Sequence, residues 1–280
     1  MPDMLMPKIV YGTAWKKDRT ADLVYTALKA GFRGVDTACQ PKHYREDLVG
    51  EGVLRAIKEG LVTRDELWLQ TKFTSIDGQD RRQPLPYDPK LPIPEQVKQS
   101  IARSLTNLGV TRIDSVVLHS PLRTREATLA AYRVLEDFVT KGTVGAIGVS
   151  NIYDADELAW LIGQATVPVS VVQNRWYQDN GWDGAVYDLC QKHGIRYQSF
   201  WTLTGSPALL QSPLVEALAT SNGITPEQTV YRLCQLWNIT PLCGSTSPTH
   251  IAEALAVENS FTLDEPAVKQ LWSVMHGERP

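Results

Sequence analysis

The stretch VDTACQPKHYREDLVG, residues 35–50, contains the unit from which the whole chain is built. An apolar run ending in Val35 and Asp36 is typical of a short buried strand, and a turn containing Pro41 follows it. His43 and Tyr44 come next, just before a run whose apolar residues recur at helical spacing. Taken alone, an Asp after a strand is more often a helix cap or a turn former. The other units of the chain must therefore show whether Asp36 and Tyr44 belong to a site.

Strand-like and helix-like segments alternate along the entire chain. Short apolar runs predict eight strands: Lys8–Gly12, Arg33–Asp36, Leu67–Phe73, Ser115–His119, Ala146–Ser150, Ser170–Gln173, Tyr197–Trp201 and Thr240–Gly244. Amphipathic segments between and after them predict helices at residues 20–30, 45–58, 94–108, 125–140, 154–165, 183–193, 212–221 with 226–237, and 248–257. Boundary signals support several of these helices, among them a capping box that begins at Thr225.

Eight such units in 280 residues, with no linker between them, predict a single (β/α)8 TIM barrel and one domain over residues 1–280. An open doubly wound sheet also alternates strand and helix, but no GxGxxG motif follows the first strand. In a barrel the active site lies at the C-terminal mouth of the strands. The one irregular segment, residues 74–93, is polar and rich in proline, and we expect a functional loop there.

The composition narrows the classes of partner. The chain has 28 basic and 31 acidic residues and a net charge of −3, so neither nucleic acid nor an anionic membrane is an expected partner. The first residues lack a signal-peptide pattern, and no apolar run approaches the roughly 20 residues of a membrane span. The four cysteines have no CxxC spacing, which argues against a zinc site or a disulfide scaffold. A cytoplasmic protein is expected.

Four proton-handling side chains fall at or just beyond the predicted strand ends: Asp36, Tyr44, Lys72 and His119. Each has an ordinary explanation when it is taken alone. Lys72 could extend from an apolar strand to water, and His119 could be a hydrogen-bonded core histidine. Tyr44 could be an interface aromatic. Their coincidence at one end of one barrel favours a site instead.

This set of residues suits the reduction of a carbonyl group. Hydride delivery to the carbonyl carbon needs a proton donor, and a Tyr hydroxyl with a pKa near ~10 must become more acidic for that task. The Lys72 ammonium would lower the pKa of Tyr44, and a buried Asp36 would keep Lys72 charged. A neutral His119 would donate a hydrogen bond to the carbonyl oxygen. No metal is required, and the sequence offers no ligand cluster for one.

The second half of the chain has the features of a dinucleotide site. Ser150, Asn151 and Gln173 place hydroxyl and amide groups at neighbouring strand ends, which suits a carboxamide-bearing ring. The pair Phe200-Trp201 offers a flat face for stacking under such a ring. The run GSTSP, residues 244–248, leads into a helix start and suits an anion. Each feature alone is more often ordinary turn chemistry.

The sequence resembles the aldo-keto reductases over nearly its whole length. The resembling segments are YGTAWK (11–16), GFRGVDTA (31–38), YREDLVGEG (44–52), LQTKF (69–73), VVLHSP (116–121), GVSN (148–151), VVQN (171–174), YQSFW (197–201) and GSTSPTHIAEA (244–254). The resemblance implies that Tyr44 is the general acid, that Lys72 and Asp36 tune it, and that His119 orients the carbonyl. It also implies a set of cofactor-binding residues: Thr13, Trp15, Asp36, Ser150, Asn151, Gln173, Phe200, Trp201, Thr202, Leu203, Ser245, Thr246, Ser247, His250, Glu253 and Ala254.

Three departures from the family pattern bear on the site. The insertion CQPKH, residues 39–43, lengthens the loop before Tyr44 and makes His43 the second candidate for the acid. Ser120 follows His119 where the family usually has an aromatic residue. Gly244 and His250 stand where NADPH-dependent members commonly carry a Lys and an Arg for the 2′-phosphate. NADPH is the expected cofactor, with NADH as its rival.

The leading hypothesis is an NAD(P)H-dependent reductase that converts small-molecule aldehydes or ketones to alcohols. The alternative is a nucleotide-binding scaffold or regulatory subunit of the same fold with little turnover, which would not need the four-residue set. A metal-dependent hydrolase lacks the ligand clusters that it needs. The expected substrate walls are the loop at 74–93 and a group of bulky residues: Trp15, Tyr87, Leu122, Trp176, Tyr177 and Trp182. The physiological substrate and the oligomeric state are left open.

Overall fold

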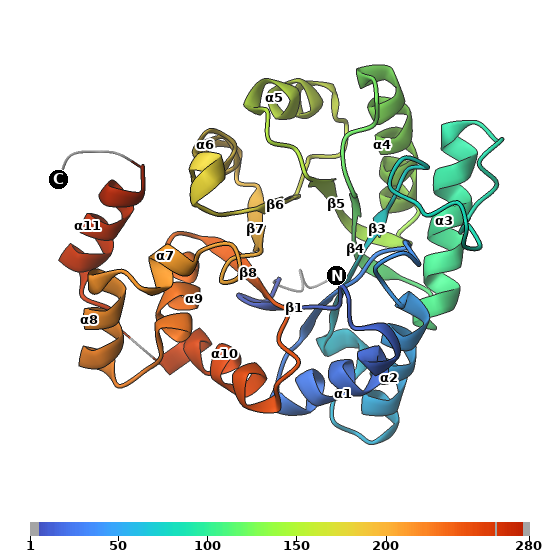
Figure 1. The fold of residues 1–280 in the computed structure, drawn as a ribbon. Coiled ribbons are helices and arrows are strands. Elements are labelled where there is room, and N and C mark those ends of the chain that lie inside the picture. The colour runs from blue at the N-terminus through green and yellow to red at the C-terminus, as the bar shows by residue number, and fades with distance from the viewer. Residues whose placement is uncertain (1–5, 261, 277–280) are drawn as a thin grey trace.

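A closed barrel of eight parallel strands forms the centre of the protein, which confirms the predicted fold class. The computed structural model describes residues 6–260 and 262–276 (Figure 1). Each strand pairs with the next one along the chain, and β8 pairs with β1. The strands are β1 Val10–Gly12, β2 Gly34–Asp36, β3 Trp68–Phe73, β4 Ile113–Leu118, β5 Val144–Ser150, β6 Val171–Arg175, β7 Arg196–Phe200 and β8 Ile239–Cys243.

Helices surround the barrel, as Figure 1 shows in a view along it. They are α1 Thr20–Ala30, α2 Glu46–Lys58, α3 Ile93–Leu108, α4 Arg125–Thr140, α5 Ala155–Gln164, α6 Gly184–His193, α7 Pro207–Leu210, α8 Pro213–Asn222, α9 Pro226–Leu236, α10 Pro248–Ser260 and α11 Glu265–His276. The 3-10 turns are η1 Lys17–Arg19, η2 Arg64–Glu66 and η3 Gln178–Asp183. Within the described residues, no helix combines the length and the apolar character that crossing a membrane requires.

Two helices lie outside the sequence prediction. α7 has only four residues, too few for a periodic pattern. α11 begins where Asp264 Oδ2 accepts a hydrogen bond from the N–H of Ala267 at 3.1 Å, and it buries Val268 and Leu271. This helix follows the eighth β/α unit, so eight strand–helix repeats do not predict it. The predicted capping box at Thr225 is present and begins α9.

Two glycines permit close approaches between elements. A Cβ atom at Gly148 in β5 would lie 1.8 Å from the carbonyl oxygen of Val171 in β6. A Cβ atom at Gly50 in α2 would lie 2.1 Å from the carbonyl oxygen of Asn107 in α3. Because no side chain fits at such distances, the strand that ends in Ser150 and the contact of α2 with α3 both depend on glycine.

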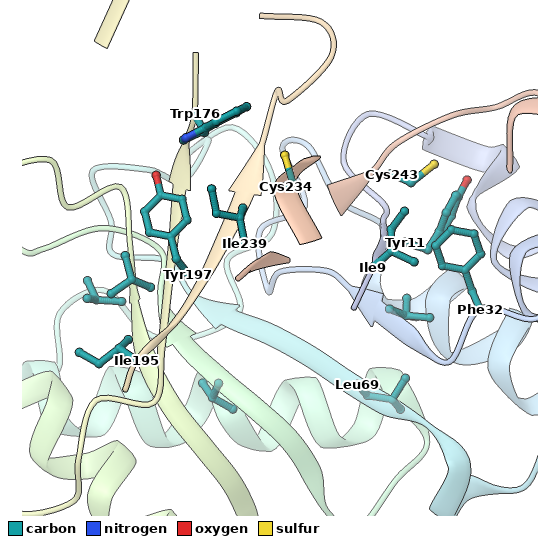
Figure 2. Close-up of a cluster of buried hydrophobic side chains, with 14 of the residues drawn as sticks. Ile9, Tyr11, Phe32, Leu69, Trp176, Ile195, Tyr197, Cys234, Ile239 and Cys243 are labelled. Carbon is teal, nitrogen blue, oxygen red and sulfur yellow. The ribbon is translucent and has the colours of Figure 1, made fainter. Parts of the chain in front are cut away.

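The apolar core lies largely between the barrel strands and the surrounding helices. Figure 2 shows part of it, where Tyr11 and Phe32 meet edge to face with ring centroids 5.8 Å apart. Inside the barrel, by contrast, lies a layer of polar side chains that includes Gln70, Gln173 and Gln198. The side-chain Nε2 groups of Gln70 and Gln173 both donate to Oε1 of Gln198, at 2.6 and 2.8 Å. These three amides come from β3, β6 and β7, so they join opposite sides of the barrel.

Candidate active site

A cavity of about 870 Å³ opens at the carboxyl ends of the strands. Its lining brings together most of the residues that the sequence singles out: Trp15, Asp36, Tyr44, His119, Ser150, Asn151, Gln173, Phe200, Trp201, Thr202, Leu203, Ser245, His250, Glu253 and Ala254. Thr13, Lys72, Thr246 and Ser247 do not line it. The Thr13 hydroxyl instead donates to the backbone oxygen of Asp36 at 2.8 Å, so it joins β1 to β2.

Lys72 and Asp36 form a buried ion pair beside the cavity. Lys72 Nζ lies 2.6 Å from Asp36 Oδ2 and donates a second hydrogen bond to the backbone oxygen of Thr37 at 2.9 Å. The other carboxylate oxygen of Asp36 accepts from the amides of Gln70 at 2.9 Å and Gln173 at 3.0 Å. Burial lowers the pKa of Lys72, and the charge of Asp36 opposes that shift. The polar layer of the barrel thus fixes the carboxylate that holds the lysine.

Tyr44 lines the cavity with its hydroxyl uncommitted. Its Oη makes no hydrogen bond to any residue in the described part of the chain. Lys72 Nζ lies 5.3 Å from the centre of the Tyr44 ring, and the His119 ring lies 5.8 Å away, edge to face. Burial and then the charge of Asp36 raise the pKa of Tyr44 above its ordinary value. The expected lowering of this pKa by Lys72 is therefore not found, because Lys72 is directed at Asp36 and Thr37.

His119 is held as a neutral imidazole. Its Nδ1 lies 2.6 Å from the hydroxyl oxygen of Thr74. Burial, together with the positive charges of Lys72 and His43, lowers the pKa of His119 to about 3. The ring is therefore uncharged at neutral pH and carries a single N–H. The sequence does not predict a role for Thr74, because a threonine after a strand has no distinguishing pattern.

The insertion before Tyr44 forms a compact turn. The backbone N–H groups of His43 and Tyr44 both donate to the carbonyl oxygen of Gln40, at 3.2 and 3.0 Å. The His43 ring lies against the Trp15 ring with 3.8 Å between centroids, and the N–H of Trp15 donates to the His43 carbonyl oxygen at 2.7 Å. His43 thus packs on Trp15 at the cavity rim, whereas Tyr44 meets His119 and Lys72.

A buried carboxyl group anchors the helix that follows this turn. Glu46, the first residue of α2, accepts hydrogen bonds from the hydroxyl of Thr71 in β3 and from the amide of Asn107 in α3, the latter at 2.9 Å. Burial raises the pKa of Glu46, and these hydrogen bonds oppose the shift. The start of α2 is thereby tied to the strand that carries Lys72.

Three polar side chains form the next part of the lining: Ser150 at the end of β5, Asn151 just after it, and Gln173 in β6. The Ser150 hydroxyl donates to the backbone oxygen of Gln173 at 2.6 Å. The Asn151 amide donates to the backbone oxygen of His119 at 2.8 Å, from a residue with φ of 53°. The amide hydrogens of Gln173 go to Asp36 and Gln198, which leaves its Oε1 as the atom able to accept a further hydrogen bond.

An aromatic and cationic group lies on the β7 side of the cavity. The guanidinium carbon of Arg175 lies 3.9 Å above the ring of Trp201 and 5.9 Å from the ring of Phe200. Trp201 has a φ of 61° and is 49 % exposed, so a bulky residue is held in the left-handed region beside the cavity. Among the described residues, Arg175 has no carboxylate partner within ion-pair distance.

Two cations from the β1 side reach the loop between β8 and α10. Lys16 Nζ donates to the backbone oxygen of Gly244, and Arg19 Nη2 donates to that of Thr246 at 3.4 Å. Burial lowers the pKa of Lys16. Within the loop, the N–H of Ser247 donates to the Ser245 hydroxyl at 3.1 Å. Positive charge is therefore present beside Gly244, although the loop itself lacks a Lys or an Arg.

A model of the aldo/keto reductase family matches residues 8–275. The chain belongs to this family. Its members are enzymes, and this assignment confirms the resemblance read from the sequence segments.

The relatives of this aldo/keto reductase agree on fold and cofactor class. A probable NAD(P)H-dependent D-xylose reductase of Emericella nidulans is 27 % identical over 98 % of the chain and 92 % of the relative. The NAD(P)H-dependent D-xylose reductase I,II of Candida tropicalis is 27 % identical over 90 % of the chain and 84 % of the relative. The solved aldo-keto reductase MGS-M4 from a Medee basin deep-sea metagenome library is 28 % identical, with a TM-score of 0.81 over 99 % of the chain and 94 % of that structure.

Several expected substrate walls of the reductase are wrong. Trp176 is fully buried and packs on Trp182, with ring centroids 4.6 Å apart. Tyr87 is 5 % exposed and packs on Phe73. These aromatics belong to the core, because a bulky side chain in a loop region looks the same in sequence whether it faces the core or the cavity. Trp15, at 65 % exposed, does line the cavity.

Proposed function

We propose that this aldo/keto reductase reduces small-molecule aldehydes or ketones to alcohols with NADPH, and that Tyr44 supplies the proton. One observation carries the proposal. Tyr44, whose hydroxyl makes no hydrogen bond within the described residues, lines the cavity next to a neutral His119 and beside the buried Lys72–Asp36 pair. A nucleotide-binding scaffold would have no use for this arrangement, since a buried ion pair is costly to keep.

The side chains divide the work at the carbonyl. When bound, the reduced nicotinamide supplies hydride to the carbonyl carbon. Tyr44 gives its hydroxyl proton to the carbonyl oxygen as the C=O double bond becomes a single bond. Burial raises the pKa of Tyr44 further above neutral pH, so the phenol carries its proton before hydride arrives. The Lys72 ammonium then stabilises the tyrosinate, and His119 donates a hydrogen bond that orients the carbonyl oxygen.

The residues of the second half fit a nicotinamide ring. The free Oε1 of Gln173 and the Ser150 and Asn151 side chains lie together at one edge of the cavity, where a carboxamide can exchange hydrogen bonds. Phe200 offers the flat face, and the backbone of Trp201 to Leu203 continues the lining. Four lining residues from the β8–α10 loop and from α10, namely Ser245, His250, Glu253 and Ala254, would hold the adenosine end.

The preference for NADPH rests on Lys16 and Arg19. Both side chains donate hydrogen bonds to the loop at 244–246, which has no Lys or Arg of its own to pair with a 2′-phosphate. Two lining carboxylates, Glu227 and Glu253, act against a phosphate. Isothermal titration of the protein with each cofactor tests the balance. We expect tighter binding of NADPH, and we expect Lys16→Met to weaken NADPH binding more than NADH binding. Equal or tighter binding of NADH to the parent would contradict the preference.

The activity itself is tested on a panel of aldehydes and ketones that includes D-xylose, the substrate named for the fungal relatives. With a reduced cofactor deuterated at the transferable position, we expect alcohol products with one deuterium on the carbinol carbon. Cofactor binding without oxidation on the whole panel would instead support the scaffold.

A further inference from the structure

Thr74 follows β3 directly and is buried, with 3 % of its surface exposed. Its hydroxyl oxygen lies 2.6 Å from Nδ1 of His119, a hydrogen-bond distance between two groups 45 residues apart in the chain. The backbones are joined at the same place, because the N–H of His119 donates to the carbonyl oxygen of Phe73 at 2.8 Å. The end of β3 therefore determines both the position of the His119 backbone and the surroundings of its ring.

The direction of this hydrogen bond follows from the available partners. A neutral imidazole carries one hydrogen, on either Nδ1 or Nε2, and a hydroxyl carries one. In the described part of the chain, Nδ1 of His119 is the only hydrogen-bond partner of the Thr74 hydroxyl. If Nδ1 carried the hydrogen, the buried hydroxyl hydrogen of Thr74 would have no acceptor. The favoured arrangement has Thr74 donating to Nδ1, which leaves the hydrogen of the ring on Nε2.

We propose that Thr74 is a positioning residue that holds His119 in its Nε2–H tautomer and so makes the imidazole a hydrogen-bond donor to the substrate carbonyl. The donation to a substrate carbonyl rests on the proposed function, whereas the tautomer of His119 does not. With the opposite tautomer, Nε2 would present a lone pair to the carbonyl oxygen and would repel it.

The proline-rich loop gives Thr74 a fixed place. The carbonyl oxygen of Thr74 accepts hydrogen bonds from the Tyr87 hydroxyl at 2.7 Å and from the Gln79 side chain at 3.3 Å. The loop also approaches its methyl group, since a Cβ atom at Gly78 would lie 2.6 Å from Thr74 Cγ2. The long segment after β3 thus closes over the residue that sets the tautomer.

Two substitutions separate the hydroxyl from the shape of the side chain. Thr74→Val keeps the branched side chain and every backbone hydrogen bond but removes the donor, whereas Thr74→Ser keeps the donor. Tyr87→Phe is the matched control, because it removes one anchor of the Thr74 backbone and leaves the Thr74 hydroxyl in place. Thermal unfolding of all three variants shows whether they fold.

The tautomer is read by two-dimensional NMR of protein labelled with ¹⁵N-histidine. The signal of His119, one of five histidines, is assigned by its loss in His119→Asn. In the parent, Thr74→Ser and Tyr87→Phe we expect an unprotonated Nδ1 and a protonated Nε2. In Thr74→Val we expect a mixture of the two tautomers. A protonated Nδ1 in the parent, or an unchanged spectrum in Thr74→Val, would overturn the proposal.

Kinetics then test the consequence. Loss of a preorganised donor typically lowers kcat by roughly 100-fold or more, and a mixed tautomer should lose part of that. We expect a reduction of about 10-fold in kcat for Thr74→Val, with Thr74→Ser close to the parent and cofactor affinity unchanged in both. An altered tautomer with unchanged kcat would overturn the catalytic half alone. A parent without activity on any carbonyl would contradict the proposed function and leave the tautomer result standing.

Discussion

The proposed proton donor of this reductase, Tyr44, depends on what surrounds its phenol. Burial and the charge of Asp36 raise the pKa of Tyr44, and the Lys72 ammonium, which would lower that pKa, is held by Asp36 and Thr37. These surroundings suit the proposed donation of the Tyr44 proton to a carbonyl oxygen. In the proposed reaction, Tyr44 loses its proton as negative charge builds up on the substrate oxygen, and the Lys72 ammonium stabilises the resulting tyrosinate.

A neutral His119 makes stability depend on pH. Its pKa is about 3 in the folded protein and about 6.5 unfolded, so the unfolded chain binds the extra proton first as the pH falls. The stability that this residue contributes is present above about pH 6.5 and is lost between that pH and about 3. In urea unfolding we expect the parent to lose up to about 2 kcal/mol more than His119→Gln between pH 7 and pH 5. Parallel losses in the two proteins would show that His119 titrates normally.

At the scale of elements, the site depends on two loops that support each other. The Gln40 side chain of the inserted turn donates to the Gly78 carbonyl oxygen at 2.7 Å, and the Gln79 side chain donates to the Cys39 carbonyl oxygen at 3.0 Å. The insertion before Tyr44 and the proline-rich loop are therefore one structural unit. Their lengths are readable from the sequence, but their mutual hydrogen bonds are not, because loop packing leaves no periodic pattern.

The contact between the paired strands β5 and β6 leaves no space for a side chain at Gly148. We expect Gly148→Ala to lower the free energy of unfolding by at least about 2 kcal/mol, since the new Cβ atom forces the strands apart next to Ser150. The matched control is Gly163→Ala in α5, where a Cβ atom would meet nothing within 4 Å. That change should stabilise the helix by up to about 1 kcal/mol. Similar effects of the two substitutions in urea unfolding would contradict the close approach.

At the scale of the whole molecule, the eightfold alternation of strand and helix predicts the barrel well. The strands are short and apolar, and a barrel places each strand end at the same mouth, which is why Asp36, His119 and Gln173 could be placed from the sequence. Contacts at the closure of the barrel, where the end of β8 lies beside the end of β1, could not be placed from the sequence. Lys16 lies 228 residues from Gly244 in the chain and donates a hydrogen bond to its backbone oxygen, which brings a positive charge to a β8–α10 loop without a Lys or an Arg of its own.

The sequence also does not show which side chains of the irregular segments lie at the cavity and which lie in the core. Trp176 and Trp182 were expected at the cavity and lie in the core, while Thr74 and Arg175 carried no signal and lie at the site. Residues on regular strands have a direction that alternates along the chain, and residues in loops do not. The placement of Tyr44 at the end of such a loop therefore needs the most direct experiment.

That experiment compares carbonyl reduction by the parent, Tyr44→Phe and His43→Gln under saturating NADPH, with cofactor binding measured alongside. Loss of the general acid should lower kcat by roughly 100- to 10,000-fold in Tyr44→Phe. His43→Gln should stay close to the parent, because His43 packs on Trp15 at the rim. Both variants should still bind the cofactor. A parent-like rate in Tyr44→Phe, or a collapse of activity in His43→Gln alone, would contradict the assignment of Tyr44 as the proton donor.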